Sequence, residues 1–234
     1  MHTRYILLVS TVISVLFATI ASIVPFGIYN QGEVSALSPT LIVPATYTFS
    51  IWSVIYLSWF ILGLVIFLWK INIKRENILL LAAAQILSSL WLIPSQYLFT
   101  ATSLIVILWV LYFLLILFFN SRNESLPFKI VSDTFLWWII VASLANLHLV
   151  LYSYGIYFYP LELTFISIIW WLILNAYLLV RYNSFAPSLV LIWALVWIII
   201  WQDAYSTVTV SIFSIFFIAW LLSYLGYSYA LAKK

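Results

Sequence analysis

Long apolar runs alternate with short polar breaks along the whole chain. A helix that crosses a bilayer needs about 20 predominantly apolar residues, and eight runs are close to that length. The expected spans are Tyr5–Tyr29, Pro44–Trp69, Ile78–Phe99, Ala101–Phe119, Val131–Tyr152, Leu163–Val180, Phe185–Trp201 and Tyr205–Ala230. A single run from Ile78 to Phe119 would be about twice as long as the bilayer core is thick, so a turn near Thr100 is required. The pattern predicts an all-α, polytopic membrane bundle of about eight transmembrane helices.

The charged residues fall in the breaks, and their placement predicts a direction. All nine cations lie on one side of the eight-span scheme, namely Arg4, Lys70, Lys74, Arg75, Arg122, Lys129, Arg181, Lys233 and Lys234. The opposite loops carry Glu33, Glu162 and Asp203 instead. Cytoplasmic loops are rich in Lys and Arg, so we expect both termini in the cytoplasm and the protein in the plasma membrane. The first run also resembles a signal peptide, whose removal would leave seven spans, but its length favours a retained helix.

Composition excludes several classes of protein. Of the 234 residues, 67% are hydrophobic and 6% are charged, whereas soluble domains are about 45–50% apolar and about 25% charged. A net charge of +3 is too small for a nucleic-acid footprint. The chain has no cysteine, and its two histidines, His2 and His148, lie far apart, so we predict no metal site. No charge lies near the middle of a span, which argues against an ion-coupled pump. Asp133, at the cytoplasmic start of its span, is expected to have a helix-end role.

Tryptophan is the most informative residue type, with 13 copies. Trp52, Tyr56 and Trp59 are spaced i, i+4, i+7, which places them on one helix face. Trp193, Trp197 and Trp201 form a second stripe with similar spacing. Aromatic stripes serve packing more often than ligand binding. Depth nevertheless favours a ligand site for the first stripe. Trp52 and Trp91 each lie about 12 Å from the outer end of their spans, and Asn146 about 9 Å. Aromatic walls with a polar anchor suit a flat hydrophobic ligand.

Uncharged polar residues inside the spans have two possible roles. They are Gln85, Ser88, Ser89, Asn146 and Asn175. For each of them we favour an interhelical hydrogen bond over contact with a ligand. His148 lies near the outer end of its span, where an interfacial position is favoured over ligation of a metal or a haem-like ring.

Two blocks of sequence point to a known family. The first runs from Pro39 through Pro44 and Phe49 to Trp52 and Tyr56, so that a proline-containing loop leads into a Trp-x3-Tyr helix. The second has Pro127 ahead of a Trp-x3-Ala-x3-Asn pattern formed by Trp138, Ala142 and Asn146. Both resemble the tryptophan-rich sensory protein family, which includes the translocator protein, or peripheral-type benzodiazepine receptor. The third span matches less well, because Ser88 stands where an asparagine is expected between Gln85 and Trp91. The last three spans, with Pro187 ahead of Trp193, resemble the longer prokaryotic subgroup.

The resemblance implies a division of the chain and a binding site. Residues 1–152 would form a five-helix core, and residues 153–234 a three-helix membrane extension. A cavity under the first external loop would bind porphyrin, haem or other flat apolar ligands, often in a homodimer, with no required cofactor. The implied ligand-binding residues are Trp52, Tyr56, Trp91, Trp138, Ala142, Asn146, Phe49, Gln85 and Ser88, and the lid loop would carry Pro39 and Pro44. Porphyrin photodegradation is proposed for some members, with Trp52 and Trp138 as the nearest equivalents, but no base, nucleophile or metal site supports an enzyme here.

Three functions remain open at this level. The favoured one is a membrane sensor of tetrapyrrole-like or other flat hydrophobic ligands. The second is a facilitator or transporter of small lipophilic solutes, for which Gln85 and Asn175 could line a route. A structural subunit, which would show neither ligand binding nor flux, is the third.

Overall fold

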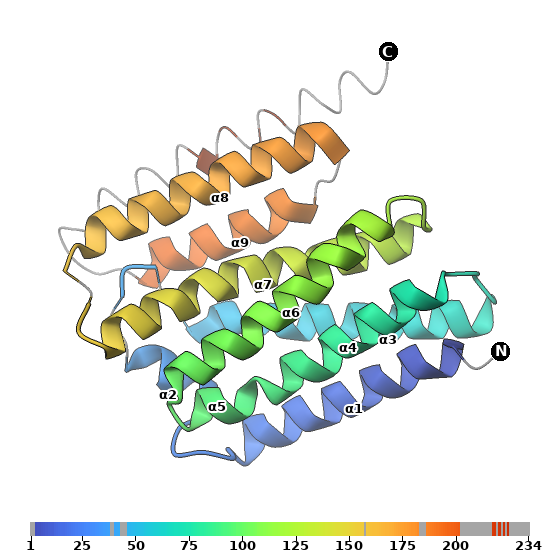
Figure 1. Ribbon diagram of the computed structural model, residues 1–234, viewed down its shortest axis with the longest axis horizontal. Helices are drawn as coiled ribbons and strands as arrows, with labels where there is room; N and C mark the ends of the chain where they lie inside the picture. Colours follow the sequence, from blue (N-terminus) through green and yellow to red (C-terminus); the bar gives the residue numbers. More distant parts are fainter. Residues whose placement is uncertain are drawn as a thin grey trace.

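The structure is a computed structural model whose regular elements are helices. It describes residues 3–37, 40–42, 46–156, 158–182, 186–201 and single positions between 217 and 224. No strand occurs among them. The helices are α1 (Thr3–Ile23), α2 (Gln31–Ala36), η1 (Thr46–Ser50, 3₁₀), α3 (Ile51–Leu68), α4 (Arg75–Leu90), α5 (Leu92–Gln96), α6 (Thr100–Asn120), α7 (Leu126–Ser153), α8 (Pro160–Tyr182) and α9 (Ala186–Trp201). Figure 1 shows the long helices side by side in one elongated bundle.

Six helical segments in the described part of the chain are long and apolar enough to cross a bilayer. They are Tyr5–Ile23, Tyr47–Leu68, Arg75–Gln96, Thr100–Asn120, Leu126–Ser153 and Pro160–Leu178. α9 supplies a shorter apolar segment, Ser188–Ile198. The chain is therefore a multi-pass membrane protein. The expected eighth span, Tyr205–Ala230, falls almost wholly outside the described residues, so the count of eight stays a prediction.

Five long helices close into a ring. α1 packs against α3 and α4, α4 packs against α6, and α6 packs against α7. Contact between α7 and α3 completes the ring. α9 packs on the outside of α7, and α8 packs against α9 (Figure 1). The inner side of α7 thus faces α3, which brings together the two helices that carry the sequence blocks.

Several helix boundaries differ from the expected ones for local reasons. α1 ends at Ile23 rather than Tyr29, because Pro25 has no amide hydrogen to continue the helix. α7 begins at Leu126 rather than Val131, since Pro127 in the first turn presets a helical φ. The turn required near Thr100 is confirmed, with Leu98 in a left-handed conformation at φ 58° between α5 and α6.

The C-terminal end of α7 is capped by backbone hydrogen bonds. Gly155 adopts φ 70°, which glycine tolerates without a Cβ clash. The amide of Gly155 donates to the Tyr152 carbonyl, and the amide of Ile156 donates to that of Leu151. These two bonds form a Schellman motif and satisfy carbonyls that would otherwise be left at the helix end.

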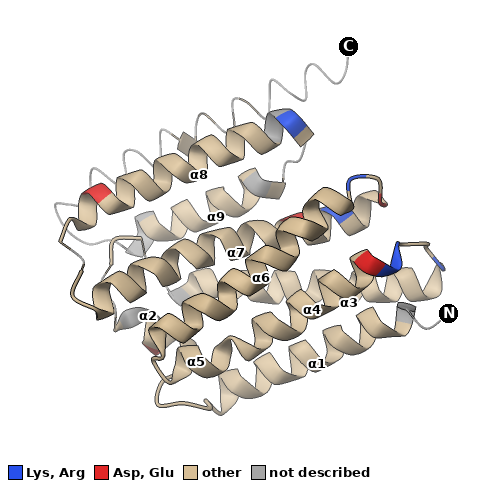
Figure 2. Cartoon of the chain, in the orientation of Figure 1, with Lys and Arg blue, Asp and Glu red and all other residues tan. Residues whose placement is uncertain are grey.

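The described cations gather at one end of the bundle, as Figure 2 shows. Lys70, Lys74 and Arg75 lie at the α3–α4 connection, Arg122 and Lys129 at the α6–α7 connection, and Arg181 near the end of α8. The opposite end carries Glu33 in α2 and Glu162 in α8. This polarity agrees with the sidedness expected from the sequence, while the direction across the membrane stays a prediction.

Candidate functional site

An aromatic cluster fills the interface between α3 and α7. It consists of Trp52, Tyr56, Trp59, Phe135 and Trp138, and we refer to it below as the aromatic cluster. The Trp52 ring stacks on Tyr56 with 5.4 Å between centroids, and it meets Trp138 edge-on at 6.2 Å. Both distances lie within the 4.5–7 Å range of favourable aromatic pairs. Three of the predicted site residues are therefore in contact.

Two members of the aromatic cluster were absent from the predicted site. Phe135 packs against Trp59 at 4.6 Å and against Trp52 at 6.2 Å. Trp59 was already assigned to the Trp52 face by its spacing. Phe135 lies three residues before Trp138 and so shares its helix face, which is a signal that the sequence contained.

The aromatic cluster combines a buried floor with a more accessible edge. Trp59, Phe135 and Trp138 are buried, whereas Trp52 and Tyr56 are half-buried. The indole N–H groups of Trp59 and Trp138 are buried and have no hydrogen-bond partner. A buried donor without a partner costs about 1–3 kcal/mol. Both indole N–H groups are therefore unsatisfied donors within the aromatic cluster.

Other predicted site residues do not take part in the ring contacts of the aromatic cluster. Trp91 is buried where α4 gives way to α5, and its indole N–H also lacks a partner, but none of the ring contacts between described residues joins it to Trp52. Ala142 follows Trp138 by one turn of α7. Phe49, in η1, is half-buried and packs against the core immediately before α3. Pro39 and Pro44, predicted to shape the lid, lie outside the described residues.

The polar groups of Gln85 and Ser88 form hydrogen bonds within α4 and to α1. The Gln85 side chain accepts a hydrogen bond from Ser10 at 2.7 Å and donates one to Thr11 at 3.1 Å, so its amide faces α1. The Ser88 hydroxyl donates to the Gln85 carbonyl of its own helix at 2.8 Å. These contacts agree with the interhelical role that we favoured for Gln85.

The two interior asparagines also join neighbouring helices. Ser103 of α6 donates to the Asn146 Oδ1 at 2.9 Å, and the Asn146 amide donates to the Ala142 carbonyl at 2.8 Å. Ser188 of α9 donates to the Asn175 Oδ1 of α8 at 3.1 Å. Such bonds hold transmembrane helices together. The same polar atoms are consequently engaged in packing.

His148 is buried between helices. It is 2% exposed, and its Nε2 lies 2.9 Å from the Ser167 hydroxyl of α8. The described residues contain no group of three or more His, Cys, Asp or Glu side chains that could hold a metal ion. His148 therefore joins α7 to α8 in the same manner as the interior amides.

The segment after α1, which is expected to be external, is tied to the C-terminal end of α5 by Gln96. Its side chain is 1% exposed, accepts a hydrogen bond from the Phe26 amide at 2.8 Å and donates to the Ala21 carbonyl at 3.0 Å. The Gln96 carbonyl accepts from the Ile28 amide at 3.1 Å. Gly27 lies directly against this carbonyl. Gln96 thus satisfies the end of α1 and fixes the path of the segment that follows.

A short helix, α2, lies in the loop between the first two expected spans. The Asn30 side chain accepts from the Glu33 amide at 3.0 Å, and Glu33 accepts from the Asn30 amide at 2.8 Å. This reciprocal pattern is a capping box, and the spacing Asn-x-x-Glu is its sequence signature. Ser95 binds Gln31 at 2.9 Å and holds α2 against α5.

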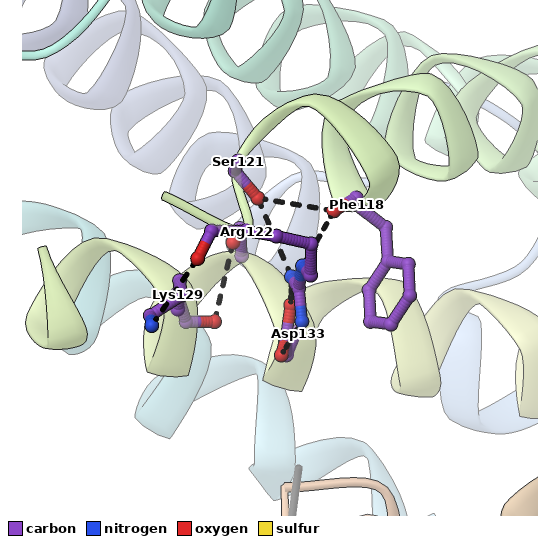
Figure 3. A network of polar contacts seen from close by, with 6 residues as sticks. Phe118, Ser121, Arg122, Lys129 and Asp133 are labelled. Carbon is purple, nitrogen blue, oxygen red and sulfur yellow. Dashed lines mark hydrogen bonds and ion pairs between the residues drawn. The ribbon is translucent and has the colours of Figure 1, made fainter. Parts of the chain in front are cut away.

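An ion pair connects α6 and α7 at the opposite, basic end of the bundle (Figure 3). The Arg122 guanidinium contacts both carboxylate oxygens of Asp133, at 2.5 and 3.1 Å. Its Nε donates to the Phe118 carbonyl at 2.6 Å, and its Cζ atom lies 3.7 Å from the centre of the Phe118 ring. The Asp133 side chain is 4% exposed. This pair joins the end of α6 to the first turns of α7, in agreement with the expected helix-end role of Asp133.

A pocket of about 270 Å³ lies away from the aromatic cluster, between α6, α7 and α8. Its lining is apolar apart from Ser143, whose hydroxyl already donates to the Ile139 carbonyl. Leu108 and Trp170 in its wall are about half exposed on the outer surface of the bundle. A crevice of this kind faces the hydrocarbon, and it lacks the few placed polar groups that orient a specific ligand.

These features define a class of protein: a polytopic α-helical membrane protein with an aromatic interface between two helices of a five-helix ring. A family model described as TSPO-like protein matches residues 4–227, and the chain belongs to that family. The match confirms the resemblance inferred from the two sequence blocks. No curated protein and no solved structure matches the chain.

Proposed function

We propose that this protein is a membrane sensor that binds tetrapyrrole-like or other flat hydrophobic ligands against the aromatic cluster. The observation that carries the proposal is the pair of buried, unpartnered indole N–H groups of Trp59 and Trp138 beside the more accessible rings of Trp52 and Tyr56. A flat ring can stack on the accessible edge, and its carboxylate or carbonyl can accept from an indole. Membership of the TSPO-like family supports a site at this place.

The proposed site is narrower than the set of residues predicted from the sequence. Trp52, Tyr56 and Trp138 form its walls, with Phe135 and Trp59 behind them. Trp91, Ala142 and Phe49 would border the ligand, whereas Gln85, Ser88 and Asn146 act through helix packing because their polar atoms are already bonded. A binding role requires no metal or cofactor.

The Trp138→Phe variant tests the proposal. Phenylalanine keeps an aromatic ring but removes the unpartnered N–H, so protoporphyrin should bind about three- to tenfold more weakly, as expected for one lost hydrogen bond. Binding is measured by the Soret absorbance shift and by saturable quenching of tryptophan fluorescence in purified protein.

A matched control is Trp109→Phe on α6. Trp109 is 54% exposed and lies outside the aromatic cluster, so its replacement should leave the dissociation constant unchanged. Equal affinities for the parent and both variants, or quenching that never saturates, would mean that the porphyrin partitions into the detergent and that the aromatic cluster is packing.

We further propose that the protein lies in the plasma membrane with its basic end in the cytoplasm. The chain has no cysteine, so single cysteines report sidedness directly. Asn123→Cys at the basic end should react with a membrane-impermeant thiol reagent only after cells are permeabilised. Phe158→Cys, in the α7–α8 connection at the other end, should react in intact cells. The reverse pattern would overturn this orientation.

A further inference from the structure

The second tryptophan stripe lies on α9, the last long helix of the described chain. Trp193 and Trp197 contact each other with 5.6 Å between ring centroids. α9 packs along the outside of α7, the helix that contributes Phe135 and Trp138 to the aromatic cluster. The stripe therefore lies close to the proposed site without being part of it.

Both tryptophans also contact η1, the 3₁₀ turn that precedes α3. The Trp193 Nε1 donates a hydrogen bond to the Thr48 carbonyl at 3.2 Å. The Tyr47 ring lies 5.7 Å from the Trp197 ring. The hydrogen bond connects residues that are 145 positions apart in the sequence. One helix of the C-terminal part thus holds the end of the first external segment.

The position of η1 makes this contact relevant to the site. η1 ends at Ser50, and α3 begins at Ile51 without a break. Trp52 follows Thr48 by four residues, one helical turn. Thr48 is fully buried, and Phe49 packs against the core. Any outward movement of η1 would therefore displace the first turn of α3 and the Trp52 ring.

We infer that α9 acts as a clamp on η1, and that Trp193 and Trp197 position Trp52 and set the rate at which ligands enter and leave the aromatic cluster. The clamp itself rests only on the contacts above, while its effect on ligand exchange rests on the proposed function. The inference gives the C-terminal extension a task, namely control of the site formed by the five-helix ring.

Hydrogen exchange in the ligand-free protein tests the clamp. In Trp193→Phe, which keeps an aromatic ring but cannot donate to Thr48, the amides of residues 46–52 should exchange roughly fivefold faster, as expected for one lost hydrogen bond. Trp197→Leu, which removes the ring contact with Tyr47, should act in the same direction. Trp170→Phe on α8 is the control, because Trp170 is 58% exposed and lines the pocket between α6, α7 and α8.

Exchange that rises only in residues 46–52 supports the clamp. Unchanged exchange there in both α9 variants overturns it, and so does a rise that extends equally to α6, which would indicate general destabilisation. In a second measurement, protoporphyrin should dissociate several-fold faster from Trp193→Phe than from the parent, and an unchanged rate would overturn control of ligand exchange. If the parent binds no protoporphyrin, the proposed function fails, yet the exchange experiment still decides the clamp.

Discussion

Replacing Asp133 with alanine is expected to lower the thermal unfolding midpoint of the purified protein by roughly 10 °C. Removing one partner of a buried ion pair costs about 3–5 kcal/mol, because it leaves a charge without compensation. Asp133 is 4% exposed and Arg122 is 20% exposed, so the effect should fall near the lower end of that range. For a chain of this length, each kcal/mol corresponds to about 2–4 °C. Thermal unfolding in detergent, followed by circular dichroism, measures the change.

Two further variants separate the ion pair from a general loss of charge. Glu76→Gln removes a carboxylate at the same end of the bundle, where it is exposed, and should change the midpoint by little. The double variant Arg122→Leu, Asp133→Leu should be more stable than Asp133→Ala, since replacing both partners by apolar groups leaves no buried charge. A double variant as unstable as the single one would show that Asp133 acts through contacts other than Arg122.

The membrane spans were predictable because bilayer thickness sets a single length for every helix. Six of the expected spans reappear as helices of sufficient length. Most errors lie at helix ends, where local chemistry decides. Pro25 ends α1 early, and Pro127 starts α7 early. α2 was missed because it is held by a capping box rather than by an apolar run.

The candidate site was only partly predictable, for a geometric reason. Helical spacing indicates which residues share a face, and it correctly grouped Trp52 with Tyr56. Spacing cannot indicate which helix that face meets when the helix is apolar on all sides, as α3 is. Trp52 and Asn146 were expected at similar depth, yet Asn146 bonds to Ser103 of α6. The order of helices around the ring decides this, and only the structure supplies it.

Gln96 is a second residue whose role depends on which helices meet, and this cannot be inferred from the sequence. A glutamine near the end of an apolar run looks like a helix-end residue, and nothing in its neighbours distinguishes it. In the structure its side chain and carbonyl bind the backbone of residues 21–28. Its partners lie about 70 positions away in the sequence, so the role depends on how α1 and α5 meet.

Gly27→Ala is the second substitution for which a large effect is expected. It tests how Gln96 holds the segment that follows α1. A Cβ at position 27 would lie 2.2 Å from the Gln96 carbonyl oxygen and 2.7 Å from the Tyr97 nitrogen. Both are backbone atoms, so no side chain can turn away to relieve the overlap. Overpacking typically costs about 1–3 kcal/mol, and here the upper end applies. The unfolding midpoint should fall by about 5–10 °C, and residues 24–30 should exchange hydrogen faster because the bonds to Gln96 are lost.

Gly63→Ala in α3 is the matched control, since both variants add one methyl group to a glycine. Its Cβ would lie 3.4 Å from the Leu8 side chain, an ordinary contact distance, and alanine is the better helix former by about 1 kcal/mol. That variant should be as stable as the parent or slightly more stable. If Gly27→Ala also kept the parent's midpoint and exchange pattern, the close packing of Gly27 on Gln96 would not be what holds the first external segment. The position of that segment would then have to depend on η1 and its contacts with α9.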